Sequence, residues 1–166
     1  MNGVDFLFVA KSTNEEITRN MGKKLGEKLK PGTVIALIGE LGAGKTVFAR
    51  GVAEGLGFTG IVNSPSFVLM NLYRGRMELY HFDFYRLEEE EELQELGLEE
   101  YFYAKGVAIV EWADKFPAAL PVKRLEVEIV KDDRDLDNSR ILYFKPRGGL
   151  DGFSCEELKK IAAPGF

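Results

Sequence analysis

The sequence has few of the features that mark secreted, membrane or nucleic-acid-binding proteins. Among its 166 residues there is one cysteine, Cys155, which excludes an internal disulfide. No apolar run is long enough to span a membrane, and the first residues lack the basic and apolar blocks of a secretory signal. The net charge of −5 argues against a broad nucleic-acid-binding face, although a local one stays open. We therefore expect a cytoplasmic protein whose length suits one domain with a full core.

The strongest pattern in the chain is a glycine-rich segment of the form G-x-x-x-x-G-K-[ST], which is typical of phosphate-binding loops. Glycines lack a Cβ atom, so the backbone can curl and point its N–H groups at an anion; the middle glycine adds freedom that the motif does not require. The lysine places a positive charge near the phosphates, and the next hydroxyl can ligate Mg²⁺. We therefore expect nucleotide binding at Gly39, Glu40, Leu41, Gly42, Ala43, Gly44, Lys45 and Thr46.

This motif lies between a predicted strand and a predicted helix, as its chemistry requires. Residues 33–38 form an apolar run that suits a strand buried on both faces. Residues 45–56 carry apolar side chains at helical spacing and end at Gly57, so the helix would direct its N-terminal dipole at bound phosphates. A chance glycine-rich turn is the alternative, and it would not need this context.

The remaining patterns predict an α/β fold of the P-loop NTPase type, with a single mixed sheet flanked by helices. The sheet should be mixed because the short turn at 74–76 forces its two strands to be antiparallel. Residues 1–147 are expected to form the P-loop NTPase domain, and 148–166 a tail with a short, loosely docked helix. The acidic run at 88–92 is expected to be a solvated helix face, with a partner-binding patch as the alternative. Strands are expected at 5–10, 67–73, 77–84, 106–111, 125–130 and 140–144, and further helices from a cap at Ser12 or Thr13 to Pro31, at 88–97 and at 154–161.

Two carboxylates stand at the ends of apolar strand patterns. Asp83 ends the run that begins at Met77, and Glu111 ends the run that begins at Val107. A buried carboxylate needs a partner for its charge, and Mg²⁺ beside the phosphate loop would supply one. A strand-end carboxylate bonded to a helix N-terminus is the structural alternative for each residue.

Three other polar residues near these segments have open roles. Ser66, on the loop after the phosphate-loop helix, could sense the γ-phosphate or could form a turn beside proline. His81 shares a strand face with Asp83 and is expected to be a core or hydrogen-bonding histidine rather than a catalytic base. Arg86 should lie on the opposite strand face and not reach a γ-phosphate, if the strand continues.

Four segments, in their order and spacing, resemble the TsaE (YjeE) family. They are the phosphate loop 39–46, Ser64-Pro65-Ser66-Phe67, His81-Phe82-Asp83-Phe84-Tyr85-Arg86-Leu87, and Val110-Glu111-Trp112. Members of that family are small bacterial ATPases that are required for threonylcarbamoyladenosine modification of tRNA. The loop motif is common to many families, whereas the histidine–aspartate and glutamate–tryptophan segments together are far more specific.

The resemblance implies roles for individual residues. Lys45 and the loop backbone would hold the phosphates of ATP, and Thr46 and Glu111 would ligate Mg²⁺ with Asp83 beside them. Ser66 falls where the family usually has threonine, in a switch-like loop, and completes the implied catalytic set of Lys45, Asp83, Glu111 and Ser66. Glu15, Ser139 and Arg140 fall where the family contacts the base or ribose, and Trp112 would lie near the nucleotide or a partner surface.

The resemblance also implies partners. Family members work with TsaD and TsaB, so this chain would meet tRNA only indirectly, through that complex, which suits its acidic charge. Hydrolysis by the free protein is expected to be slow, because no arginine finger is evident near the expected metal ligands. A small-molecule P-loop kinase is one alternative, although residues 56–67 are too short for an acceptor domain. A nucleotide-gated interaction module with negligible turnover is the other.

Overall fold

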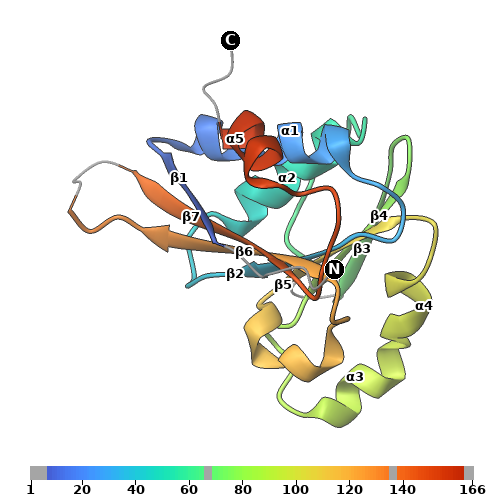
Figure 1. Ribbon diagram of the computed structural model, residues 1–166. Coiled ribbons are helices and arrows are strands. Elements are labelled where there is room, and N and C mark those ends of the chain that lie inside the picture. The colour runs from blue at the N-terminus through green and yellow to red at the C-terminus, as the bar shows by residue number, and fades with distance from the viewer. Residues whose placement is uncertain (1–6, 66–68, 135–137, 163–166) are drawn as a thin grey trace.

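The computed structural model describes residues 7–65, 69–134 and 138–162, and these residues build one seven-stranded sheet with helices on both faces (Figure 1). The strands follow the order β1-β7-β6-β2-β5-β4-β3 across the sheet. Their bounds are β1 Phe8–Ser12, β2 Val34–Ile38, β3 Met70–Arg74, β4 Glu78–Asp83, β5 Val107–Glu111, β6 Arg124–Lys131 and β7 Arg140–Arg147. The helices are α1 Glu15–Lys28, α2 Lys45–Gly55, α3 Glu90–Leu96, α4 Leu98–Phe102 and α5 Cys155–Ala162, with short 3₁₀ turns at η1 Ala113–Lys115 and η2 Pro117–Ala119.

The sheet is mixed, as predicted. Strand β2 lies at its centre and pairs in parallel with β5 and β6, and β4 pairs in parallel with β5. The hairpins β3–β4 and β6–β7 and the edge pair β1–β7 are antiparallel. Strands β2 and β5 are buried on both faces, which explains why they are continuous apolar runs rather than alternating patterns.

The two faces of the sheet carry separate hydrophobic clusters. Helices α1, α2 and α5 cover one face, where Phe48 and Leu25 pack on side chains such as Leu37. Helices α3 and α4 cover the other face, where Phe102 packs in a cluster with Phe82 (Figure 1). No described helix has both the length and the apolar character needed to cross a membrane.

Helices α1 and α2 approach each other through glycines. Gly22 and Gly26 on α1 face the backbone of α2, and Gly51 and Gly55 on α2 face the backbone of α1. A Cβ atom at Gly51 would lie 2.0 Å from the Arg19 carbonyl oxygen, and one at Gly22 would lie 2.3 Å from the Phe48 carbonyl oxygen. The close crossing therefore depends on the absence of side chains, and it holds the phosphate-loop helix against α1.

The ends of several elements differ from the sequence-based prediction: β1 is Phe8–Ser12 rather than 5–10, and β7 continues to Arg147 rather than ending at 144. The cap of α1 is Asn14, whose side chain accepts a hydrogen bond from the Ile17 N–H at 2.9 Å, because Ser12 is still part of β1. Gly97, at φ +62°, ends α3, and the chain continues as a second helix, α4, that the sequence analysis missed. The expected strand over 67–73 begins at Met70, and residues 66–68 lie outside the described residues.

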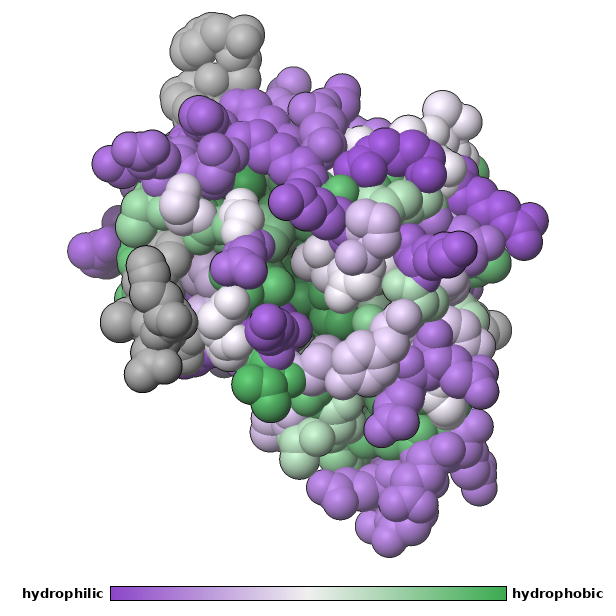
Figure 2. Space-filling model, turned by 45° about the vertical axis from the view of Figure 1, so that its right-hand side comes forward, coloured by the Kyte–Doolittle hydropathy of each residue, from purple (hydrophilic) through white to green (hydrophobic). Residues whose placement is uncertain are grey.

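The prediction of a loosely docked final helix is wrong. Leu158 and Ile161 are fully buried on the face that α1 and α2 cover, and Phe153 packs with them. Lys28 on α1 forms an ion pair with Glu157 on α5 at 3.0 Å. Leu158 and Ile161, together with Phe153, dock this short helix on the core. The acidic helix α3 behaves as expected: residues 88–92 are exposed, and Figure 2 shows hydrophilic side chains over the lower end of the molecule, where α3 lies in Figure 1.

Candidate nucleotide and metal site

The phosphate loop joins the end of β2 to the start of α2 and requires its glycines for different reasons. Gly42 and Gly44 have φ angles of +79° and +112°, which L side chains rarely adopt. Gly39 leaves room for a neighbouring strand, because a Cβ atom there would lie 2.6 Å from the Ile129 carbonyl oxygen. The middle glycine, which the motif alone does not demand, is therefore needed by the backbone of this chain.

Lys45 is folded back on its own loop. Its Nζ atom donates to the carbonyl oxygens of Gly39 at 2.5 Å and Glu40 at 2.8 Å, and it lies 4.1 Å from the centre of the Trp112 ring. Burial lowers the pKa of the Lys45 ammonium from its usual value, and the nearby Glu111 and Asp83 carboxylates oppose that shift. The Lys45 ammonium is therefore buried and bound to its own loop, beside the expected phosphate-binding position.

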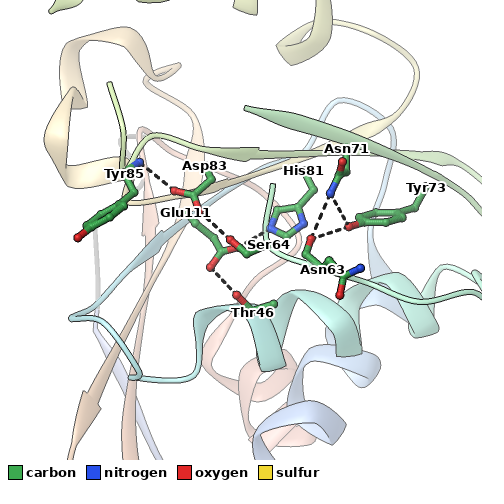
Figure 3. Close-up of polar contacts among 9 residues, drawn as sticks. All are labelled: Thr46, Asn63, Ser64, Asn71, Tyr73, His81, Asp83, Tyr85 and Glu111. Atoms are coloured by element: carbon green, nitrogen blue, oxygen red, sulfur yellow. Dashed lines mark hydrogen bonds and ion pairs between the residues drawn. The ribbon is translucent and has the colours of Figure 1, made fainter. Parts of the chain in front are cut away.

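The two predicted carboxylates meet because their strands are neighbours. Asp83 and Glu111 are register partners at the carboxyl ends of the parallel strands β4 and β5, and both are buried. The Thr46 hydroxyl donates to Glu111 Oε1 at 3.0 Å (Figure 3). Asp83 accepts hydrogen bonds from the Ser64 hydroxyl and the Tyr85 N–H, both at 2.8 Å.

This set of donors fits Mg²⁺. A hydroxyl and two carboxylates are hard oxygen ligands, and two buried carboxylates side by side repel each other unless a cation lies between them. No group of three or more His, Cys, Asp or Glu suited to a metal occurs among the described residues. That is compatible with Mg²⁺, which usually takes one or two protein carboxylates and leaves its other positions to phosphate oxygens and water.

The loop, the carboxylates and α1 enclose a cavity of about 470 Å³. Its lining includes most of the residues that the sequence analysis selected: Glu15, Leu41, Gly42, Gly44, Lys45, Thr46, Asp83, Glu111 and Arg140. Gly39, Glu40 and Ala43 line a smaller cavity of about 290 Å³ that shares Trp112 with the first. The Ser139 side chain is buried and is not part of either lining, and Ser66 lies outside the described residues.

Arg140 supports the loop backbone in this structure. Its guanidinium donates to the carbonyl oxygens of Ala43 at 2.9 Å and Gly42 at 3.3 Å. The same side chain lines the cavity, so contact with a base or ribose stays a prediction. These hydrogen bonds connect β7 to the phosphate loop.

The expected position of Arg86 assumed that β4 continues past Asp83, and it does not. Strand β4 ends at Asp83, so the alternation of a strand no longer applies three residues later, and Arg86 lines the cavity. Trp112 is half-buried, has a left-handed φ of +57°, and its ring centre lies 4.9 Å from that of Tyr85. Both residues line the cavity.

Several lining residues were not selected from the sequence. Thr18, Val47 and Tyr85 reach the cavity from α1, α2 and the segment after β4. The Ser64 hydroxyl contacts the site carboxylate Asp83, and the Ser-Pro-Ser pattern was a signal for either serine. Thr18 had no signal, because its position follows from the crossing of α1 over α2.

Comparison with known proteins gives consistent matches. The family model "Threonylcarbamoyl adenosine biosynthesis protein TsaE" matches residues 12–141. The chain is 44% identical over 151 residues to the tRNA threonylcarbamoyladenosine biosynthesis protein TsaE of Bacillus subtilis, with 90% of this chain and 92% of that protein covered. It is 40% identical over 110 residues to the protein of that name from Treponema pallidum, covering 66% and 82%. The crystal structure of Bacillus subtilis YdiB superposes with a TM-score of 0.80 at 37% identity and covers 95% of this chain and 97% of its own.

Proposed function

The chain belongs to the TsaE family, and we propose that it is a Mg²⁺-dependent ATPase that supports a TsaD–TsaB complex in threonylcarbamoyladenosine modification of tRNA. The observation that carries the ATPase proposal is the convergence of the phosphate loop, Thr46 and the paired carboxylates Asp83 and Glu111 on one cavity. In this role the protein would act in the cytoplasm, where tRNA is modified.

Different residues of the chain would bind the phosphates, hold the metal ion and orient the metal ligands. The loop N–H groups and the amino end of α2 would bind the phosphates, and Lys45 would turn from its loop carbonyls toward them. Thr46, Asp83 and Glu111 would hold Mg²⁺, which when bound offsets charge on the phosphates. Ser64 keeps Asp83 oriented, and Arg86 brings an arginine to the cavity from within the chain.

A TsaD–TsaB complex is proposed as the partner because the family resemblance implies it, and the electrostatics of the chain are compatible with it. The net charge of −5 makes tight binding of tRNA by this chain alone unfavourable, so tRNA would be met through the complex. The kinase alternative receives no support from the fold, since α2 and β3 are joined by a short connection rather than an acceptor domain.

The test is phosphate release from ATP, measured with and without Mg²⁺ and with and without purified TsaD and TsaB. Lys45→Ala should lose most nucleotide binding, because the phosphate charge is then uncompensated. Lys123→Ala, which removes an exposed lysine outside the cavity, is the matched control. We expect hydrolysis to increase with both partners, whereas Arg86 in the cavity removes the sequence-based reason for expecting slow turnover by the free protein. Phosphate release that is identical in the parent and in Lys45→Ala would refute the ATPase proposal.

A further inference from the structure

His81 contacts a proposed metal ligand, Glu111, from inside the core. It lies on β4, its side chain is fully buried, and its Nε2 atom is 2.5 Å from Glu111 Oε2 (Figure 3). The register explains the contact: His81 pairs with Ile109, and Glu111 lies two residues further along the neighbouring strand, on the same face. The pairing is therefore built into the sheet and does not depend on a flexible loop.

The contact fixes the orientation of the Glu111 carboxylate. One oxygen, Oε1, accepts from the Thr46 hydroxyl, and the other, Oε2, is held by the imidazole. A carboxylate that is held at both oxygens has little freedom to rotate. Histidine thus sets the direction in which Glu111 presents its remaining lone pairs to the cavity.

The rest of the imidazole ring indicates where its hydrogen lies. The Nδ1 atom is buried and has no hydrogen-bond partner among the described residues. A hydrogen on Nδ1 would be a buried donor without an acceptor, whereas a hydrogen on Nε2 is accepted by Glu111. The Tyr73 ring, whose centre lies 5.9 Å from that of His81, packs beside the imidazole.

From these contacts we infer that His81 is a positioning residue for Glu111, which it orients by donating from Nε2. This inference rests on the proposed function only in taking Glu111 as a metal ligand. Outer partners of metal ligands generally orient the ligand, and losing them weakens metal binding about 10- to 100-fold. His81 should therefore affect the metal and leave the affinity for metal-free nucleotide unchanged.

The first experiment uses the fact that His81 is the only histidine in the chain. In protein labelled with ¹⁵N in the imidazole, the two ring nitrogens give one unambiguous pair of signals. We expect the hydrogen on Nε2. A hydrogen on Nδ1 alone would leave nothing to donate to Glu111 and would overturn the inference. This measurement needs no substitution and no turnover.

The second experiment compares two amides. In His81→Gln the side-chain nitrogen can reach the place of Nε2, whereas in His81→Asn it reaches only the place of Nδ1, so the second variant is a matched polar control. Mn²⁺ binding is measured with a non-hydrolysable ATP analogue present, and analogue binding is measured separately in chelator. We expect His81→Asn to weaken Mn²⁺ binding about 10- to 100-fold and His81→Gln to recover most of it.

The outcomes separate this inference from the proposed function. Equal loss in the two variants, or no loss in either, would make His81 a packing residue and overturn the inference. If either variant fails to fold by circular dichroism, the ¹⁵N measurement on the parent decides. If the parent binds metal and nucleotide but does not hydrolyse ATP, the ATPase proposal fails while the Mn²⁺ comparison still tests the role of His81.

Discussion

Substituting Gly51 by alanine tests whether the α1–α2 crossing positions the phosphate-loop helix. Gly51 is buried in the middle of α2, where a Cβ atom would lie 2.0 Å from the Arg19 carbonyl oxygen and 2.9 Å from the Lys23 nitrogen. On an exposed helix the same change would stabilise the protein by about 1 kcal/mol, because alanine is the better helix former. The steric clash at the crossing would lower stability and the better helix propensity would raise it, so the sign of the change shows which effect dominates.

The magnitude follows from the distances. Cβ contacts below 3.0 Å essentially never occur, so the helices must separate by about 1 Å at this point, and both clashing atoms belong to backbone that cannot rotate away. Overpacking of this kind typically costs about 1–3 kcal/mol of stability. Because rigid backbone lies on both sides of the clash, we expect a cost of about 3 kcal/mol. After the gain in helix propensity, we expect a net loss of about 2 kcal/mol. For a chain of this length that is about 6 °C in Tm.

Thermal and urea unfolding followed by circular dichroism measure this loss. Glu27→Ala, at an exposed position of α1, is the control and should change stability by less than about 0.5 kcal/mol. Because α2 begins with Lys45 and Thr46, we also expect Gly51→Ala to weaken nucleotide binding. A variant that is more stable than the parent, with unchanged nucleotide affinity, would refute the role of the crossing.

Three further outcomes are expected. Arg140→Ala should weaken ATP binding about tenfold by calorimetry, since the guanidinium no longer holds the loop carbonyls, and an unchanged affinity would contradict this. Tyr73→Phe removes the hydroxyl that donates to the Asn63 carbonyl at 2.9 Å, and should lower the free energy of unfolding in urea by about 1 kcal/mol. An unchanged free energy of unfolding would show that the loop at Asn63 is held by other contacts. Emission of Trp112, the single tryptophan, should change when nucleotide draws Lys45 off its ring, and a constant spectrum at saturation would mean that the lysine stays.

Local patterns were enough to predict the parts of the fold that depend on short stretches of chain. The phosphate loop lies between strand and helix as predicted, because the motif and its apolar flanks are contiguous in sequence. The β3–β4 hairpin was predictable because its turn is too short for any other connection. The carboxylates Asp83 and Glu111 were identified because each ends a buried strand, where a charge needs a partner.

Other features depend on which elements become neighbours, and no short stretch of sequence contains that information. Arg86 faces the cavity because β4 ends at Asp83, and Lys45 rests on Trp112 because β5 ends beside the loop. The tail helix docks because Leu158 and Ile161 find a surface made by distant segments.

The four helix glycines and His81 show most clearly what the sequence determines and what only the tertiary structure decides. Glycine inside a helix is unfavourable on propensity alone, and only the approach of a second backbone to within 2.0–2.4 Å of a would-be Cβ atom explains Gly22, Gly26, Gly51 and Gly55. The sequence by itself determined that His81 and Asp83 share a strand face. Only the strand order, with β4 beside β5, decided that the imidazole meets Glu111, because pairing between parallel strands is set by packing over the whole sheet.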